Sequence, residues 1–187
     1  MGTIVFFVLL AVLALWIVGA YNRLIALKNQ VVNGWKQIDV QLKRRHDLIP
    51  NLIETVKGAM NFEKSTLEAV ISARNKAIGA SGVKETAAAE GQLTQALGRF
   101  FALSEAYPEL KSNQNVLQLQ EELTGTENKI GFSRQAYNDI STQYNTAQMQ
   151  FPTNLVAGLA KAVPAELWEI EDPAERAVPK VDLGFGK

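Results

Sequence analysis

Histidine and carboxylate side chains are the groups of this 187-residue chain that could support acid/base catalysis or metal binding. His46 is the only histidine, and it precedes Asp47, so the pair resembles an acid/base couple. Adjacent residues on a helix point about 100° apart, however, and no serine or cysteine nucleophile stands at a recognisable spacing from them. We therefore expect His46 to be a surface histidine near a helix cap rather than a catalytic base.

Composition and motifs argue against the other common chemistries. The chain has no cysteine, no Glu-x-x-His pair for a two-metal bundle site and no glycine-rich phosphate loop. Because 19 basic side chains balance 19 acidic ones, the charge gives no sign of nucleic-acid binding. The sequence therefore predicts no catalytic, cofactor-binding or metal-binding residue, no cofactor, no small-molecule substrate and no nucleic-acid partner.

The N-terminal 22 residues have the length and composition of a membrane-spanning helix. Residues 4–20 are almost wholly apolar, and a helix that crosses the bilayer needs about 20 residues. No Lys or Arg precedes this segment, whereas Arg23, Lys28 and Lys36 follow it, which predicts an N-terminus outside and a body in the cytoplasm. Arg23 and Lys28 are expected to reach the lipid headgroups. Residues 1–22 are interpreted as an anchor that joins the bilayer.

A cleaved signal peptide is the alternative for this segment, because Val18-Gly19-Ala20 offers small residues for a peptidase. The segment lacks the basic start of a signal, and its apolar run is longer than usual. An uncleaved anchor is therefore favoured over a secreted soluble binding protein.

The residues that follow predict an all-α fold, in which the anchor continues into an antiparallel bundle of long helices over residues 23–162. Apolar positions recur every three or four residues from Leu24 to about Gly79, and Pro50 predicts either a kink or a restart capped by Asp47. A second helix is expected over residues 86–106, and a third from a Ser112 cap to Pro152. The expected inward positions of the first segment after Pro50 are Ile53, Val56, Met60, Leu67, Ile71 and Ile78. Those of the second helix are Leu93, Leu97, Phe100 and Leu103. Those of the third helix are Val116, Leu119, Leu123, Thr126, Ile130, Ser133, Tyr137, Ile140, Tyr144, Ala147 and Phe151.

Two features of the bundle bear on its contacts. Trp35 and Leu123 are expected to be buried, and the inward Tyr137 and Tyr144 to have hydrogen-bonded hydroxyls. The triplet Lys43-Arg44-Arg45 stands about 30 Å from the membrane along a continuous helix, too far to bind lipid. It could pair with Glu121, Glu122 and Glu127 of a second copy, or these charges could pair within one bundle, together with Arg134, or stay solvated.

Residues 163–187 contain prolines and mixed charges and are expected to form an extended tail. Leu167, Trp168 and Phe185 are its large apolar residues. Two interpretations stay open, since these side chains could dock on a partner or fold back on their own bundle.

Several strings of this sequence together resemble the LemA family of bacterial membrane-anchored proteins. The strings are Tyr21–Arg23, Asn33–Trp35, Gln37–Arg45, Asp47–Leu52, Glu54–Gly58, Glu105–Lys111, Leu119–Leu123, Thr126–Ile130, Arg134, Tyr137-Asn138, Tyr144-Asn145, Phe151-Pro152 and Pro179–Asp182. The resemblance implies a single-pass protein of the inner membrane with its N-terminus outside, a cytoplasmic helical bundle and no established catalytic activity. Relatives often carry Tyr and His where this chain has Ala59 and Phe62, so no metal or pH-sensing role of that histidine is transferred.

The sequence and the resemblance together favour a non-enzymatic membrane scaffold or adaptor, self-assembling, with a role in envelope maintenance or stress. Its expected partners are further copies of itself and an unidentified membrane protein, with a membrane protease as one candidate. The alternatives are an enzyme with an unrecognised site and the secreted binding protein.

Overall fold

The computed structural model describes residues 1–57 and 63–169 of the chain. These residues form helices and no strand, which confirms the all-α prediction. The helices are α1 (Gly2–Lys57), α2 (Lys64–Gly79), α3 (Val83–Ser104), α4 (Pro108–Lys111), α5 (Gln114–Met149) and α6 (Asn154–Ala157). The expectations for Ala59, Met60, Phe62, Phe185 and residues 179–182 lie outside the described part.

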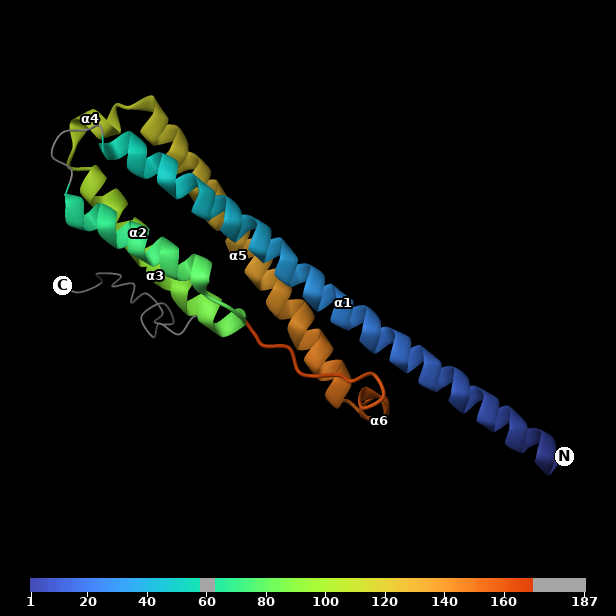
Figure 1. Ribbon diagram of the computed structural model, residues 1–187. Coiled ribbons are helices and arrows are strands. Elements are labelled where there is room, and N and C mark those ends of the chain that lie inside the picture. The colour runs from blue at the N-terminus through green and yellow to red at the C-terminus, as the bar shows by residue number, and fades with distance from the viewer. Residues whose placement is uncertain (58–62, 170–187) are drawn as a thin grey trace, which may run out of the picture.

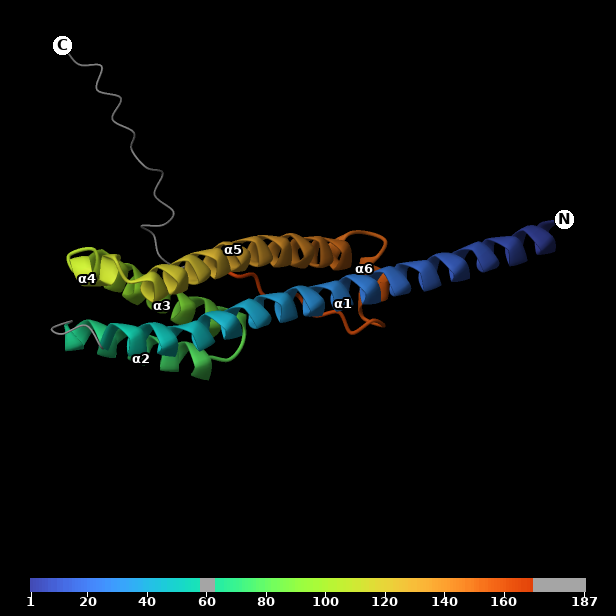
Figure 2. The ribbon, with the colours of Figure 1, turned by 90° about the horizontal axis from the view of Figure 1, so that it is seen from above.

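A pair of long antiparallel helices, α1 and α5, forms the axis of the molecule (Figure 1). The α2–α3 hairpin packs at one end of this pair, and α6 packs beside α1 and α5 at the other end. Beyond α6, the N-terminal part of α1 extends alone, as both ribbon views show (Figure 2). The molecule is therefore a bundle with one helix projecting from it.

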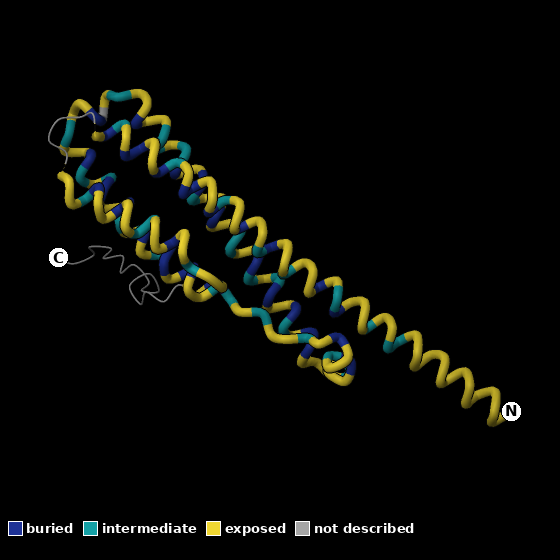
Figure 3. Tube along the Cα trace, viewed as in Figure 1, coloured by how far each residue is buried: buried dark blue, intermediate teal, exposed yellow. Residues whose placement is uncertain are grey.

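Helix α1 runs without a break from Gly2 to Lys57 and includes Pro50. The restart considered for Pro50 is therefore not adopted, and residues 1–22 and 23–57 belong to one helix. Colouring by exposure shows the projecting part exposed on almost all sides (Figure 3). Its buried positions begin at Leu24 and continue at intervals to Val56.

Helix α5 buries most of its predicted stripe, including Val116, Leu123, Ile130 and Tyr137. Two details of the prediction are wrong. The N-cap is Asn113, whose side chain accepts hydrogen bonds from the next turn, and not Ser112. Phe151, at the other end, is exposed because the chain has already left the helix.

The α2–α3 hairpin departs further from the expected pattern. Helix α2 begins as a separate element at Lys64, and Ile71 and Ile78 are exposed although they were expected to face inward. Because α2 packs mainly on α3, its inward face is set by Leu67, Val70 and Ala77. Helix α3 buries three of its four predicted positions, whereas Leu103 is only partly buried.

The core consists of three clusters arranged along the bundle. The cluster farthest from the N-terminus joins α1, α2, α3 and α5 and contains Phe100 and Leu123. The middle cluster holds Ile38, Tyr137 and Trp168, and the third, beside α6, holds Leu24 and Ala160. The tail residue Trp168 is therefore part of the core.

Candidate functional site

A buried cluster of charged side chains joins α1, α3 and α5 in the middle of the bundle. Arg45 donates from Nη1 to Glu90 Oε2 at 3.1 Å and from Nη2 to Thr94 Oγ1 at 2.8 Å. The second nitrogen also lies 3.1 Å from Glu127 Oε2 on α5. The other oxygen of Glu90 is 2.6 Å from His46 Nε2. One carboxylate thus holds two consecutive residues of α1.

Glu90 has no exposed surface, and Arg45 is only 2% exposed. Removing a charge from water costs several kcal/mol, so such groups are stable inside a protein only when their hydrogen-bonding positions are satisfied. Here each carboxylate oxygen of Glu90 has a partner, and the guanidinium of Arg45 contacts two carboxylates and a hydroxyl. The cluster therefore fixes α3 against α1 at one position.

The expectation that His46 is a surface histidine is wrong. Its side chain is buried because the ring faces α3 and pairs with Glu90. Its backbone carbonyl accepts a hydrogen bond from Arg74 Nε of α2 at 2.7 Å. Pro50 has no N–H to donate to this carbonyl, four residues back, so the arginine supplies the bond that the proline removes. The bond offsets one cost of a proline inside α1, the unsatisfied carbonyl, and it ties α2 to α1 at this point.

A groove of about 460 Å³ adjoins the cluster. It is lined by Trp35, Asp39, Lys43 and Asp47 of α1 and by residues of α2, α3 and their connection, and His46 and Glu90 lie at its base. No group of three or more His, Asp and Glu side chains in the described part of the chain is placed to hold a metal ion. Because Glu90 is already engaged by Arg45 and His46, the arrangement acts foremost as a structural lock.

The structure brings together four of the six charged residues predicted for interaction, and does so within one chain. Arg45 pairs with Glu127 at 3.1 Å, and the exposed Arg44 lies 3.8 Å from Glu122. This is the alternative of pairing inside the bundle, and it leaves Arg45 inaccessible to a second copy.

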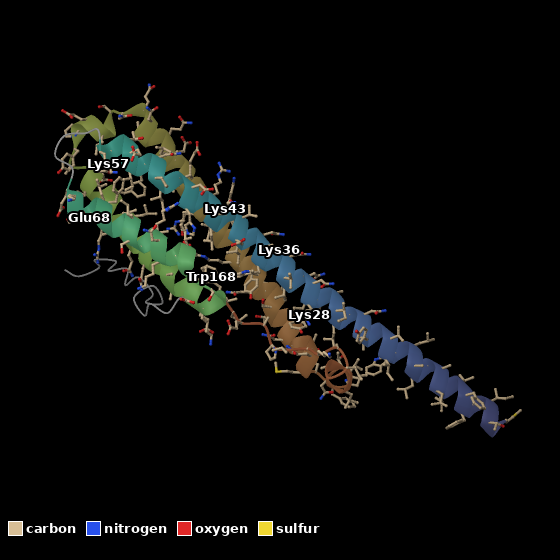
Figure 4. All side chains as sticks on the ribbon, viewed as in Figure 1. Lys28, Lys36, Lys43, Lys57, Glu68 and Trp168 are labelled. Carbon is tan, nitrogen blue, oxygen red and sulfur yellow. The ribbon has the colours of Figure 1, made fainter. Side chains whose placement is uncertain are left out.

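The other two, Lys43 and Glu121, are exposed. Figure 4 shows Lys28, Lys36 and Lys43 stepping along the length of α1. Arg23 and Lys28 are exposed next to the apolar stretch, which is long and apolar enough to cross a membrane and is not buried by any described residue.

The second polar site is a clamp that holds residues 165–168 on α5. The side-chain amide of Asn145 donates to Ala165 O at 2.9 Å and accepts from Ala165 N at 2.8 Å. Asn138 makes the same pair of bonds to Trp168, at 2.9 and 2.8 Å. Between them, the Tyr137 hydroxyl donates to Glu166 O at 2.8 Å. The tail therefore folds back onto its own bundle at Trp168, which is one of the two outcomes left open.

The indole of Trp168 packs in the middle of the bundle (Figure 4). Its ring centroid is 5.9 Å from that of Trp35, and Arg134 lies 4.5 Å above it. Trp35 is only partly buried, contrary to expectation. Its ring packs on Trp168 and Tyr137, but the residue also lines the groove, and this keeps part of it exposed.

The two inward tyrosines have different environments. Burial raises the pKa of Tyr137, whose hydroxyl is hydrogen-bonded as predicted. The hydroxyl of Tyr144 is buried and has no hydrogen-bond partner among the described residues, so the prediction was wrong there.

Sequence reasoning missed Glu90, Arg74, Asn138 and Asn145 as organising residues. Glu90 was detectable in principle, because it falls three residues before Leu93 on the inward stripe of α3. The asparagines follow the two inward tyrosines one heptad apart, but nothing in that spacing identifies the backbone that they bind.

Comparison with known proteins bears on this arrangement. The profile of the LemA family matches residues 34–183. Protein LemA of Metamycoplasma hominis is 30% identical over 159 residues, which cover 81% of this chain and 72% of that protein.

Magnetosome protein MamQ 1 of Paramagnetospirillum magneticum is 24% identical over 82% of this chain, and MamQ of Magnetospirillum gryphiswaldense is 23% identical over 73% of it. This chain spans 66% and 60% of the lengths of those two proteins. The family profile covers α1 from Gly34 onward, the whole ion cluster and the clamp. The chain belongs to the LemA family.

Proposed function

We propose that this chain is a non-enzymatic membrane-anchored scaffold of the bacterial inner membrane. The observation that carries the proposal is the continuity of α1, whose exposed apolar part and bundle part form one helix. A helix that leaves the bilayer without a joint sets the height of the bundle above the membrane and couples the orientation of the bundle to that of the span. Such a geometry suits a protein that positions partners.

The proposed topology places the N-terminus outside and the body in the cytoplasm. It is supported by the exposed Arg23, Lys28 and Lys36, since basic residues next to a span favour the cytoplasmic side. Protease added to intact spheroplasts should leave the body uncut and should digest it after the membrane is opened. Digestion of the body from outside would show that the topology is the reverse of the one proposed.

We further propose that anchored copies assemble side by side and act with a membrane protein, a membrane protease being the first candidate, in envelope maintenance or stress. Confinement to one plane raises the effective concentration of the bodies, so that weak contacts suffice. Lys43 and Glu121 are the candidate contacts, because both are exposed, whereas Arg45 is occupied inside its own bundle.

Charge reversal tests this assembly. Full-length protein in mild detergent should form oligomers that Lys43→Glu or Glu121→Lys weakens and that the double variant restores, while Lys57→Glu serves as a matched control far along α1. Oligomers that ignore both reversals would exclude these charges, and a monomer at low and high salt would overturn self-assembly. Cross-linking in intact membranes, followed by identification of the captured protein, tests the partner.

A second candidate function is an enzyme, which the His46–Glu90 pair at the base of the groove favours. A histidine paired with a carboxylate is a common general base. Turnover of a substrate by the purified chain, lost in His46→Gln with the fold intact, would establish it.

A further inference from the structure

Five large apolar side chains lie exposed on one short segment at the end of the bundle where α1 projects. We call residues 149–163, which contain α6, the α6 corner. Its exposed fractions are 69% at Met149, 80% at Phe151, 68% at Leu155, 70% at Leu159 and 71% at Val163. Such a concentration on a water-soluble surface is unfavourable and marks an interaction site.

The opposite face of the α6 corner packs on the bundle. Val156 and Ala160 are 2% and 7% exposed, and Ala160 belongs to the same apolar cluster as Leu24 of α1. The exposed side chains are therefore held outward by a packed face and do not belong to an unfolded loop.

The α6 corner lies at the level where the apolar stretch of α1 ends. Helix α6 packs against α1, and both ribbon views place it where α1 leaves the bundle (Figures 1 and 2). Trp16, Ile17 and Ala20 are the partly covered residues of an otherwise exposed stretch before Tyr21. Leu24, which shares an apolar cluster with Ala160 of the corner, follows Asn22 by two residues, so the corner packs on a part of α1 that begins about 3 Å beyond the expected end of the span.

The charge of the α6 corner suits a lipid surface. No acidic residue occurs between Asp139 and Glu166, and Lys161 is the only basic residue of the corner. Amphipathic segments of this kind lie in the membrane interface with their apolar side chains among the acyl chains and their basic residues near the phosphates.

We propose that the α6 corner is a second membrane-contacting surface, which inserts Phe151, Leu155 and Leu159 into the lipid interface beside α1. The inference rests on the membrane anchoring of α1 proposed above. It adds a second point of attachment, on one side of α1, which fixes the rotation of the body about the helix axis.

The absence of cysteine from the chain allows single labels to test this contact. Leu13→Cys, Leu159→Cys and Phe132→Cys would each carry a polarity-sensitive fluorophore in the full-length protein. The protein is reconstituted in phosphatidylethanolamine–phosphatidylglycerol vesicles containing lipids with a nitroxide either near the headgroup or deep in the chain. Phe132 is the matched control, because it is 74% exposed on α5, away from the corner.

The label at Leu159 should lose fluorescence with the shallow nitroxide, the label at Leu13 with the deep one, and the label at Phe132 with neither. In Phe151→Cys protein, the pair Leu155→Ser and Leu159→Ser should abolish quenching of a label at position 151, whereas Phe132→Ser should not.

Quenching at Leu13 but not at Leu159 would overturn the second contact and keep the anchor. Absence of quenching at both would overturn the anchor as well. A Leu159 label shielded from a water-soluble quencher but untouched by the lipid nitroxides would assign the corner to a protein contact, which also overturns the proposal.

Discussion

Glu90 is a carboxylate in the interior of the bundle whose charge is compensated by side chains of α1. Arg45 and His46 reach it from α1, and Glu127 of α5 shares the arginine. A buried ion pair contributes little net stability compared with a well-packed apolar pair, but removing one partner leaves an uncompensated charge. The cluster should therefore matter more for which helix faces meet than for total stability.

Glu90→Ala should lower the free energy of unfolding of the detergent-solubilised full chain by about 3–5 kcal/mol, because Arg45 loses its most buried partner. Replacing both residues, by Arg45→Met with Glu90→Leu, should cost less than the single change. Equilibrium unfolding in urea measures both differences.

Glu122→Ala is the control for this series. Glu122 pairs with Arg44 at 3.8 Å on the surface, where an ion pair contributes about 0–1 kcal/mol. If Glu90→Ala cost no more than this control, the cluster would not be a lock.

Tyr137→Phe should change how stability depends on pH. The pKa of Tyr137 is raised above its ordinary value of 10.0 by burial, so the folded chain keeps a proton that the unfolded chain releases. The unfolded state then binds fewer protons, and stability falls as pH rises above 10.0 toward the raised value. At neutral pH the variant should lose about 0.5–1.5 kcal/mol with its hydrogen bond to Glu166, and the two stability curves should converge in alkali. Parallel curves would contradict this assignment.

The residues of the cluster could be predicted from the sequence only in part. The stripe on α3 contains Glu90, but its partners are separated from it by 44 and 45 residues, and local periodicity carries no information about which faces meet. The polarity of His46 led us to expect it at the surface. Its burial depends on a partner that no local pattern reveals.

At the scale of elements, the clamp depends on a match between two spacings, one along α5 and one along the tail. Asn138 and Asn145 are seven residues apart on α5, a rise of about 10.5 Å. The backbone units that they bind, at Ala165 and Trp168, are three residues apart, which spans about 10 Å in an extended chain. Both side-chain amides can therefore form two hydrogen bonds with one stretch of tail.

Asn138→Ala together with Asn145→Ala should release this stretch. Four hydrogen bonds to the backbone of Ala165 and Trp168 are lost, so amide hydrogen exchange of residues 164–169 should become faster while that of α1 and α5 stays unchanged. Asn128→Ala, at an exposed position of the same helix, is the matched control. Equal protection in the double variant and the control would mean that Trp168 and the Tyr137–Glu166 hydrogen bond hold the tail without the asparagines.

The long helices could be predicted from the sequence because apolar residues recur with helical period over many turns. The seam of α5 was found at Leu123, Ile130 and Tyr137. The continuation of α1 through Pro50 could not be predicted in this way, since the His46 carbonyl is satisfied by Arg74 of another helix. Ile71 and Ile78 look inward by periodicity, but α2 is covered mainly by α3, so part of its apolar surface stays exposed.

At the scale of the whole molecule, the height of the body follows from the continuity of α1. Glu54 lies 32 residues beyond Asn22, which is about 48 Å along a helix. A donor fluorophore at Glu54→Cys should therefore report a distance of about 45–50 Å from an acceptor at the bilayer surface, and Lys28→Cys should report about 10 Å. Similar values at both sites would mean that the body lies flat on the membrane.

Because one helix serves both the lipid and the body, the anchored protein is a lever whose fulcrum is the membrane surface. Its short arm, residues 3–22, is about 30 Å long, and its long arm, to Lys57, is about 52 Å. Membranes of different thickness are accommodated by helix tilt, and a tilt of about 20° would carry the far end of the body sideways by about 18 Å. A change in bilayer thickness would thus displace the bundle end with α4 sideways, and by more than the change in thickness, because α1 has no hinge between the two arms.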